Sequence, residues 1–252
     1  MEWYEKLYQN DYTGLCGFGD SAQTRKEAEF TAEALGLSSD STLLDICCGF
    51  GRHAFEISHL TGCSVAGVDL SDEYLAAAKE KYKSDKIKYV KGDMRDFHVD
   101  GKFDTAVNLF TSFGFFDQDD ENEKVIRQAN LHLKKDGLFL LDIENKFNFI
   151  FNDVLKKEDK WQQLDSGKYC LMHNEYDIIN EREIFLAKIV EQGKSDVNVG
   201  YNIRLYSLPE LKVMLNRNGF DLVSFWGDFD KSAYTIYSRR LITLWKKVTD
   251  PA

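Results

Sequence analysis

The stretch that decides the fold is LLDICCGFGRHA, residues 43–54. A short apolar run containing Asp45 is followed by Gly49-x-Gly51-x-x-Ala54, the spacing of a turn that joins a strand to a helix and binds a dinucleotide. A dinucleotide presents a negatively charged pyrophosphate to such a turn, and a carboxylate at the position of Asp45 opposes it. The same carboxylate suits a ligand that carries a positive charge.

Outward from this turn, short apolar runs alternate with amphipathic helices. The runs are TLLDI, CSVAGVDL, KIKYVKGD, FDTAVNLF and LFLLDIEN, and we expect helices after Gly51, Ser71 and Asp119. A further helix is expected over SAQTRKEAEFTAEALGL, capped by Ser21, within an amino-terminal cover of residues 1–38. Strands that alternate with helices predict a mostly parallel sheet covered on both faces.

Beyond residue 145 the period of the sequence changes. Residues 159–206 hold the alternating stretches KYCLMHNEYDI, EIFLAKIVEQ and VNVGYNIRLYS, which predict an inserted antiparallel meander. Ser207-x-x-Glu210 is a capping box that opens a final helix. Two strand-like runs follow, and we expect them to form a hairpin at the edge of the sheet.

Composition and charge narrow the classes of partner. The 252 residues are 43% hydrophobic, enough for one large core, and carry 32 basic against 42 acidic side chains. The net charge of -10 offers no general attraction to a polyanion, so no nucleic acid is expected. Five cysteines without a C-x-x-C pair indicate neither a disulfide framework nor a zinc site, and we expect no metal and a reducing cytoplasm. No apolar run approaches the ~20 residues of a membrane span, so no membrane partner is expected either.

Residues 41 to about 145 resemble a class I S-adenosylmethionine-dependent methyltransferase. LLDICCGFGRHAFEIS is similar to the first motif of that family, VAGVDLS to the second, VKGDMRDF to the third and FDTAVNLFTSFGFF to the fourth. Four motifs in order at the expected strand ends are specific, whereas the glycine motif alone is weak. The resemblance implies a Rossmann-like α/β fold, a mostly parallel class I methyltransferase sheet with a C-terminal antiparallel hairpin and an inserted β meander.

The resemblance also implies which residues bind S-adenosylmethionine. Asp45 suits its positive charge, Asp69 would accept hydrogen bonds from both ribose hydroxyls, and Asp93 would meet the adenine amino group. The expected cofactor residues are Asp45, Cys47, Gly49, Gly51, Arg52, Asp69, Leu70, Asp93, Met94, Asn108, Leu109 and Phe110.

For several of these residues, or their neighbours, the sequence allows two interpretations of the role. Cys47 stands where the family usually has Gly or Ala, which predicts an altered shape around the methionine moiety without loss of binding. Asp96 lies close to Asp93 and is the alternative turn residue. Arg52 reaches either the cofactor carboxylate or an ion-pair partner, whereas His53 is expected to be structural rather than a base.

The sequence says less about which residues bind the methyl acceptor. In this architecture the inserted meander and the amino-terminal segment lie over the carboxyl ends of the strands. We therefore expect a methyltransferase domain of residues 1–145 and 207–252, and an inserted substrate-cover region of residues 146–206. No catalytic residue is assigned; Tyr12 and His173 are candidates, and the acceptor candidates are Tyr8, Phe113, Phe115, Tyr176, Tyr201 and Arg204.

The predicted function is methyl transfer from S-adenosylmethionine to N or O of a small-molecule acceptor, with S-adenosylhomocysteine as product, by a monomer or homodimer. The Asn-Leu-Phe-Thr sequence at residues 108–111 disfavours the subclass that methylates exocyclic amines of bases. Two alternatives remain at this point. One is an NAD(P)-dependent oxidoreductase, which the glycine spacing loosely fits, and the other is a catalytically silent binding subunit with the same fold.

Overall fold

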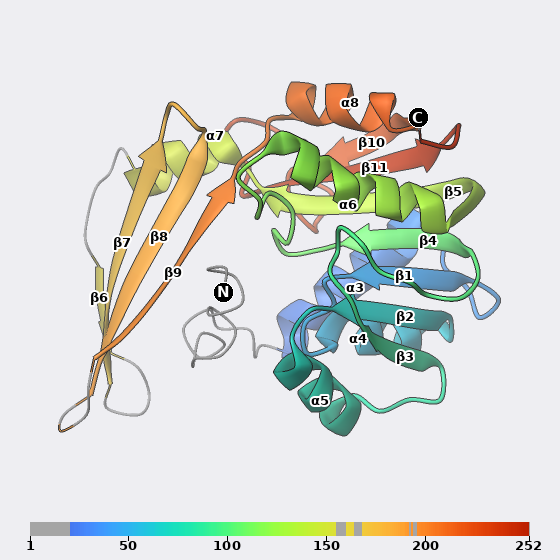
Figure 1. Ribbon diagram of the computed structural model, residues 1–252, viewed down its shortest axis with the longest axis horizontal. Coiled ribbons are helices and arrows are strands. Elements are labelled where there is room, and N and C mark those ends of the chain that lie inside the picture. The colour runs from blue at the N-terminus through green and yellow to red at the C-terminus, as the bar shows by residue number, and fades with distance from the viewer. Residues whose placement is uncertain (1–20, 155–159, 164–167, 192, 194–195, 252) are drawn as a thin grey trace.

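The computed structural model describes residues 21–154, 160–163, 168–191, 193 and 196–251 (Figure 1). Its main sheet has the strand order β10-β11-β5-β4-β1-β2-β3. Strands β1 to β5 pair in parallel, while β11 runs antiparallel to both β5 and β10. The strands are β1 (Thr42–Ile46), β2 (Ser64–Asp69), β3 (Ile87–Lys91), β4 (Phe103–Asn108), β5 (Leu133–Glu144), β10 (Phe220–Trp226) and β11 (Arg240–Lys247).

The antiparallel pair β10–β11 lies at the edge of the sheet, as predicted, but its two strands are joined by a long connection. The last strand β11 lies inside the sheet, between β5 and β10, and residues 227–239 form a long connection rather than a tight turn. Leu241, Ile242, Leu244 and Trp245 are all buried, so β11 needs cover on both faces. The half-exposed β10 therefore takes the edge position.

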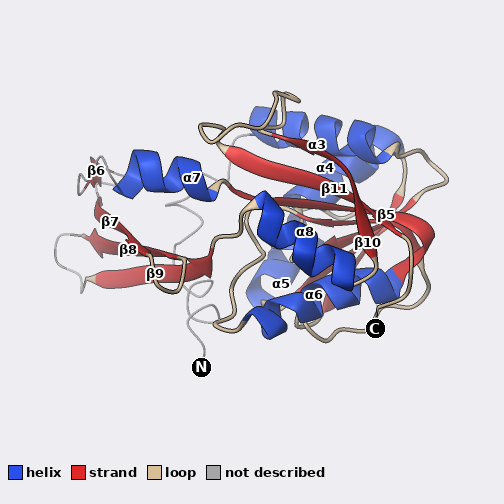
Figure 2. Cartoon of the chain, turned by 90° about the horizontal axis from the view of Figure 1, so that it is seen from above, coloured by secondary structure: helices blue, strands red, loops and turns tan. Residues whose placement is uncertain are grey.

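Alternate side chains of the strands supply two apolar cores, one on each face. Leu43 and Leu140 pack with helices α3 (Ser21–Leu35) and α4 (Arg52–Thr61), while the neighbouring Leu44 and Leu141 pack on the opposite face. Helices α6 (Asp119–His132) and α8 (Leu208–Arg217) cover that second face (Figure 2). Helix α5 (Asp72–Lys81) follows β2 and contacts β2 and β3.

Two helix starts confirm the capping signals of the sequence, at Ser71 and Ser207. The Ser71 side chain accepts a hydrogen bond from the Tyr74 amide at 3.2 Å at the start of α5. Ser21, the predicted cap of α3, is the first residue of that helix, and the residues before it lie outside the described chain. Ser207 and Glu210 form the reciprocal capping box of α8. In the described part of the chain, no helix is both long and apolar enough to cross a membrane.

The predicted meander forms a separate antiparallel sheet in the order β6-β7-β8-β9, beside the main sheet in Figure 1. Its strands are β6 (Lys160–Gln163), β7 (Tyr169–Asp177), β8 (Arg182–Val190) and β9 (Val197–Arg204). The short helix α7 (Lys146–Phe149) and the π-helical turn η1 (Ile150–Val154) precede it. The sequence analysis did not predict these two turns, because one or two helical turns are too short to show a helical period.

Buried polar contacts fasten the second sheet to the loop that follows β4. The Arg182 guanidinium on β8 donates to the Phe116 carbonyl at 2.9 Å, and the Arg204 amide on β9 donates to the Gly114 carbonyl at 2.8 Å. A Cβ atom at Gly114 would overlap the Arg204 carbonyl oxygen, so only glycine permits this approach. The two sheets therefore meet at a fixed junction.

Candidate active site

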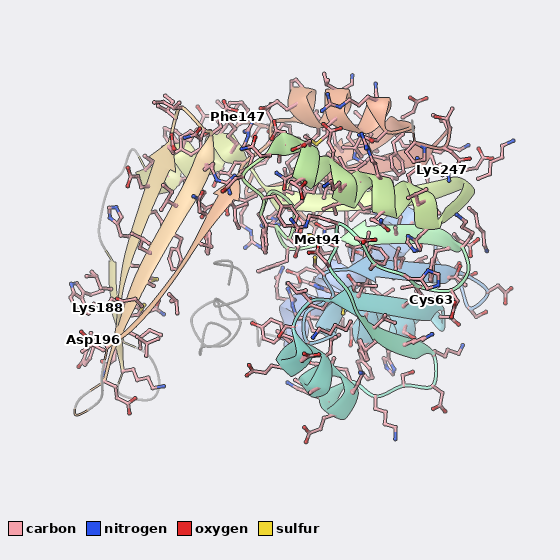
Figure 3. The ribbon with its side chains drawn as sticks, viewed as in Figure 1. Cys63, Met94, Phe147, Lys188, Asp196 and Lys247 are labelled. Carbon is pink, nitrogen blue, oxygen red and sulfur yellow. The ribbon has the colours of Figure 1, made fainter. Side chains whose placement is uncertain are left out.

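A cavity of about 460 Å³ lies between the carboxyl ends of the parallel strands and strands β8 and β9. Its volume falls in the range of small-molecule pockets, roughly 300–1,000 Å³. Figure 3 labels Met94, one of its lining residues, at the end of the main sheet that faces the second sheet. The lining from the main sheet and its loops includes Asp45, Cys47, Gly49, Arg52, Asp69, Leu70, Asp93, Met94, Leu109, Phe110, Thr111, Phe115, Phe116 and Arg240. The second sheet adds Glu183, Tyr201 and Ile203.

The loop after β1 brings its backbone close to the cavity. Gly49 and Gly51 have φ values of 56° and 83°, and a Cβ atom at Gly51 would collide with the Tyr89 hydroxyl. Cys47 also has a positive φ, 65°, a conformation that costs a residue with a Cβ atom about 1–2 kcal/mol. Cys47 thus adopts a backbone conformation that glycine adopts without this cost.

One buried and one partly buried carboxylate face the cavity beside this loop. Asp45 at the end of β1 is 2% exposed, and its Oδ2 has no hydrogen-bond partner among the described residues. Burial, together with the charge of Asp69, raises the pKa of Asp45 to about 7. Asp69 accepts hydrogen bonds from the Gly49 amide at 2.8 Å and the Ser71 amide at 2.9 Å. A cation placed between these groups would relieve the cost of burying them.

The loop after β3 presents Asp93 and Met94. Asp93 accepts hydrogen bonds from the Arg95 amide at 2.8 Å and from the Arg95 guanidinium at 2.6 Å. Partial burial acts to raise the pKa of Asp93, but the bonds from Arg95 outweigh it and hold the pKa below its ordinary value. Asp93 is thus an oriented, ionised acceptor in the cavity wall, and Asp96 does not line the cavity.

Arg52 and His53 at the start of α4 share one acid from α3. Arg52 donates to Glu27 at 2.8 Å and to Thr24 at 2.9 Å, and His53 Nε2 lies 2.7 Å from Glu27. Burial acts to raise the pKa of Glu27, but the bonds from His53 and Arg52 lower it to about 2. Burial lowers the pKa of His53. Arg52 and His53 thus both line the cavity while they pair with Glu27.

The turn after β4 is strained and held by a buried ion pair. Phe110 and Thr111 have φ values of 60° and 58°. The Phe110 amide donates to Asp142 at 2.8 Å, and Arg240 donates to Asp142 at 2.7 Å and to Thr111 at 2.9 Å. The guanidinium groups of Arg52 and Arg240 lie 4.8 Å and 5.5 Å from the centre of the Phe110 ring. These contacts fix the Phe110 backbone and ring at the cavity wall.

A family model described as a methyltransferase domain matches residues 43–137. The solved structure of an S-adenosylmethionine-dependent methyltransferase from Clostridium acetobutylicum has the same fold, with a TM-score of 0.79 at 19% identity over 95% of this chain and 100% of that chain. Residues 43–137 therefore form a methyltransferase domain, and the chain has the fold of the class I S-adenosylmethionine-dependent methyltransferases.

Curated relatives of this methyltransferase extend beyond the matched domain. It is 25% identical over 215 residues to the putative methyltransferase YqeM of Bacillus subtilis, covering 81% of this chain and 83% of the relative. It is also 25% identical over 239 residues to the glycine/sarcosine N-methyltransferase of Aphanothece halophytica, covering 89% of this chain and 85% of the relative. Both similarities therefore include part of the second sheet.

The residues at the cavity fit the cofactor of this methyltransferase family. S-adenosylmethionine carries a sulfonium and an ammonium, and the buried Oδ2 of Asp45 is an acceptor without a protein donor among the described residues. Asp69 is oriented by two backbone amides, and a carboxylate accepts up to about four hydrogen bonds, so ribose hydroxyls can still bind to it.

Two of the predicted cofactor residues of the methyltransferase lie behind the cavity wall. Asn108 is completely buried and donates to the Ile46 carbonyl at 3.0 Å, so it holds β4 against β1. Gly51 supports the loop from beneath, next to Tyr89. The other ten predicted cofactor residues line the cavity.

The predicted acceptor residues divide between the cavity and other places. Phe115 and Tyr201 line the cavity, whereas Tyr8 and Tyr12 lie outside the described residues. Four candidates do not line the cavity. Phe113 packs on Tyr206 with ring centres 5.2 Å apart, Tyr176 packs on Phe149 at 6.4 Å, His173 is exposed on β7, and Arg204 pairs with Glu181 and Glu210.

The sequence analysis missed Glu183 on β8, which is 2% exposed and lines the cavity of the methyltransferase. The Tyr201 hydroxyl donates to Glu183 Oε1 at 2.7 Å. A usable signal was present, because Glu183 shares one strand face with Phe185, Ala187 and Ile189. A carboxylate in register with three apolar side chains indicates a buried acid. Thr111 and Arg240 were also missed, since nothing in their local sequence predicts the ion pair with Asp142.

Proposed function

We propose that this methyltransferase transfers the methyl group of S-adenosylmethionine to a nitrogen or oxygen atom of a small molecule and releases S-adenosylhomocysteine. The observation that carries the proposal is the pairing of Asp45 and Asp69 at one end of a cavity whose other wall belongs to the second sheet. The carboxylates suit a cationic donor molecule, and the opposite wall leaves room for an acceptor.

The contacts support a role for each loop in holding the cofactor. Asp45 would accept a hydrogen bond from the ammonium group, and Asp69 would accept from the two ribose hydroxyls. Asp93 would accept from the adenine amino group while the Met94 backbone meets the ring edge. Leu109 and Phe110, fixed by the ion pair beneath them, would support the methionine moiety.

When bound, S-adenosylmethionine supplies an electrophilic methyl group on a positively charged sulfur atom. The protein must align an acceptor atom with the methyl–sulfur bond and exclude water, and neither task requires a covalent intermediate on a side chain. The position of the cavity between two sheets supports both tasks. A proton acceptor is needed when the nucleophile arrives protonated.

Two observations support a small acceptor over a nucleic acid. The net charge of -10 disfavours binding to a phosphate backbone. The relative from Aphanothece halophytica is named for glycine and sarcosine, which are small amines.

Calorimetry with S-adenosylhomocysteine tests the cofactor site. We expect micromolar binding to the wild-type protein and a loss of about 2 kcal/mol or more, roughly thirtyfold, in Asp69→Ala, because a charge-assisted acceptor is removed. Asp85→Ala, an exposed carboxylate after α5, is the matched control and should bind as the wild type does. Absence of binding to the wild-type protein, or full binding to Asp69→Ala, would contradict the proposal.

A further inference from the structure

We propose that Glu183 and Tyr201 form the acceptor site, and that the acceptor binds there through an amino group. The inference rests on the proposed function and narrows its acceptor atom from nitrogen or oxygen to an amine nitrogen. It concerns the wall of the cavity that β8 and β9 supply, opposite Asp45 and Asp69.

Glu183 is a buried acid at the cavity wall. It is 2% exposed and continues the apolar face of Phe185, Ala187 and Ile189. Burial of a carboxylate costs several kcal/mol in lost hydration, which its polar contacts must offset, whereas an apolar residue at this position carries no such cost. A buried carboxylate that lines a cavity is a candidate binding group.

Tyr201 fixes the direction of this carboxylate. Its hydroxyl donates to Glu183 Oε1 at 2.7 Å, and its ring stacks on Phe185 with centres 4.9 Å apart. Phe185 and Tyr201 are cross-strand partners, so the same sheet face positions both the acid and the phenol. A carboxylate accepts up to about four hydrogen bonds, and an amino group can supply further donors.

The charges of the cavity favour a cationic acceptor. Each of its three arginines pairs with an acid outside the lining: Arg52 with Glu27 at 2.8 Å, Arg240 with Asp142 at 2.7 Å and Arg239 with Asp228 at 3.6 Å. The charges of these arginines are thus neutralised by acids that do not line the cavity. The carboxylates in the wall include Asp45, Asp69 and Glu183, so the cavity attracts an ammonium ion.

The aromatic rings of Phe115, Phe116 and Tyr201 complete this part of the lining. Aromatic faces attract cations through their quadrupoles and exclude water from the carbon chain of an amine. An alcohol acceptor would gain from the apolar contact but not from the charge. The combination therefore selects amines over alcohols of the same shape.

The site also supplies the proton acceptor that an amine requires. The bound ammonium passes one proton to a carboxylate oxygen of Glu183, which frees the nitrogen lone pair. That lone pair forms the new nitrogen–carbon bond while the carbon–sulfur bond breaks and its electron pair stays on sulfur. The methylated nitrogen carries the positive charge, and the proton on Glu183 leaves to solvent.

The test is calorimetric titration of the protein saturated with S-adenosylhomocysteine. Butylammonium chloride is compared with 1-butanol, which has the same shape without the charge. We expect the wild-type protein to bind butylammonium at least about tenfold more tightly than butanol. In Glu183→Gln this preference should fall below about threefold, with the affinity for S-adenosylhomocysteine unchanged within about twofold. Tyr201→Phe should weaken the preference to an intermediate value.

Glu175→Gln is the matched control, because Glu175 is an exposed acid on the neighbouring strand β7. It should keep the full preference for butylammonium. Equal binding of the two probes by the wild-type protein, or a preference retained in Glu183→Gln, would overturn this inference alone. Failure of the wild-type protein to bind S-adenosylhomocysteine would instead overturn the proposed function, and this inference with it.

Discussion

At the scale of single residues, the proposed contact of Asp45 with the cofactor links binding to proton release. Its pKa of about 7 in the free protein means that a large fraction of Asp45 is protonated below neutral pH. A bound ammonium group favours the ionised carboxylate and lowers this pKa, so binding expels the proton. In the free protein the protonated form stabilises the fold, and this contribution is lost as pH rises through about 7.

We therefore predict that the affinity for S-adenosylhomocysteine rises between pH 6 and pH 7.5, and that nearly one proton is released per complex at about pH 6. Titrations in phosphate and in imidazole buffer measure this release, because the two buffers differ in ionisation enthalpy. Asp45→Asn should show weaker binding with little proton release. Identical heats in both buffers for the wild-type protein would contradict the assignment of Asp45.

At the scale of elements, Glu27 joins α3 to α4. Glu27→Gln leaves Arg52 buried without a carboxylate, and we expect a loss of about 3 kcal/mol in the free energy of unfolding at pH 7. The folded pKa of about 2 lies below the ordinary 4.5, so the stabilisation by Glu27 is complete above pH 4.5 and is lost as pH falls through about 2.

Urea unfolding at pH 7 and pH 3 measures this effect, and the difference between wild type and Glu27→Gln should be smaller at the lower pH. The control is Glu29→Gln on the same helix, where the exposed pair with Arg25 is worth less than about 1 kcal/mol. Equal losses in the two variants would show that the buried network contributes nothing.

The ion pair beneath the strained turn gives a second prediction at this scale. Arg240→Met leaves Asp142 buried without its partner and should cost about 3–5 kcal/mol in unfolding free energy. The double variant Asp142→Asn, Arg240→Met should recover part of this loss, because the unpaired charge is removed. A double-mutant cycle by denaturant unfolding measures the coupling. Additive losses would mean that the two side chains act independently.

Some elements of this fold were predictable from sequence, because they depend on residues close together in the chain. The positive φ of Gly49, the ends of β1 and β2, and the convergence of Asp45 and Asp69 follow from the period and the glycine spacing. The interior position of β11 was not predictable, because the sequence of a strand does not determine which strands pair with it.

The sequence also does not predict which residues of the second sheet line the cavity. Alternation predicts that two faces exist but not which face meets the cavity. The register of Glu183 with three apolar side chains indicates a buried acid, but only the packing shows that its face lines the cavity while His173 is exposed.

At the scale of the whole molecule, the junction between the two sheets depends on Gly114. Gly114→Ala would force a Cβ atom against the Arg204 carbonyl oxygen, at a φ of 102°. Gly101→Ala is the matched control, since its φ of 92° imposes a similar backbone cost while nothing lies within 4 Å of the added atom.

We expect Gly114→Ala to lose about 1–3 kcal/mol more than Gly101→Ala in thermal or denaturant unfolding, because overpacking adds to the backbone cost. Hydrogen exchange should rise along β9 and the loop at residues 112–118 in the first variant only. Equal losses of unfolding free energy in the two variants would show that the junction accommodates the added Cβ atom without a further loss of stability.

The division of the cavity between two sheets has a consequence for inheritance. In the proposed binding mode, contacts to the methyl donor come from several loops in the first half of the chain, whereas the second sheet's part of the opposite wall comes from one continuous stretch, residues 182–203. Recombination that replaced only the gene segment for this stretch would leave the methyl-donor site unchanged. The encoded protein would bind different methyl acceptors.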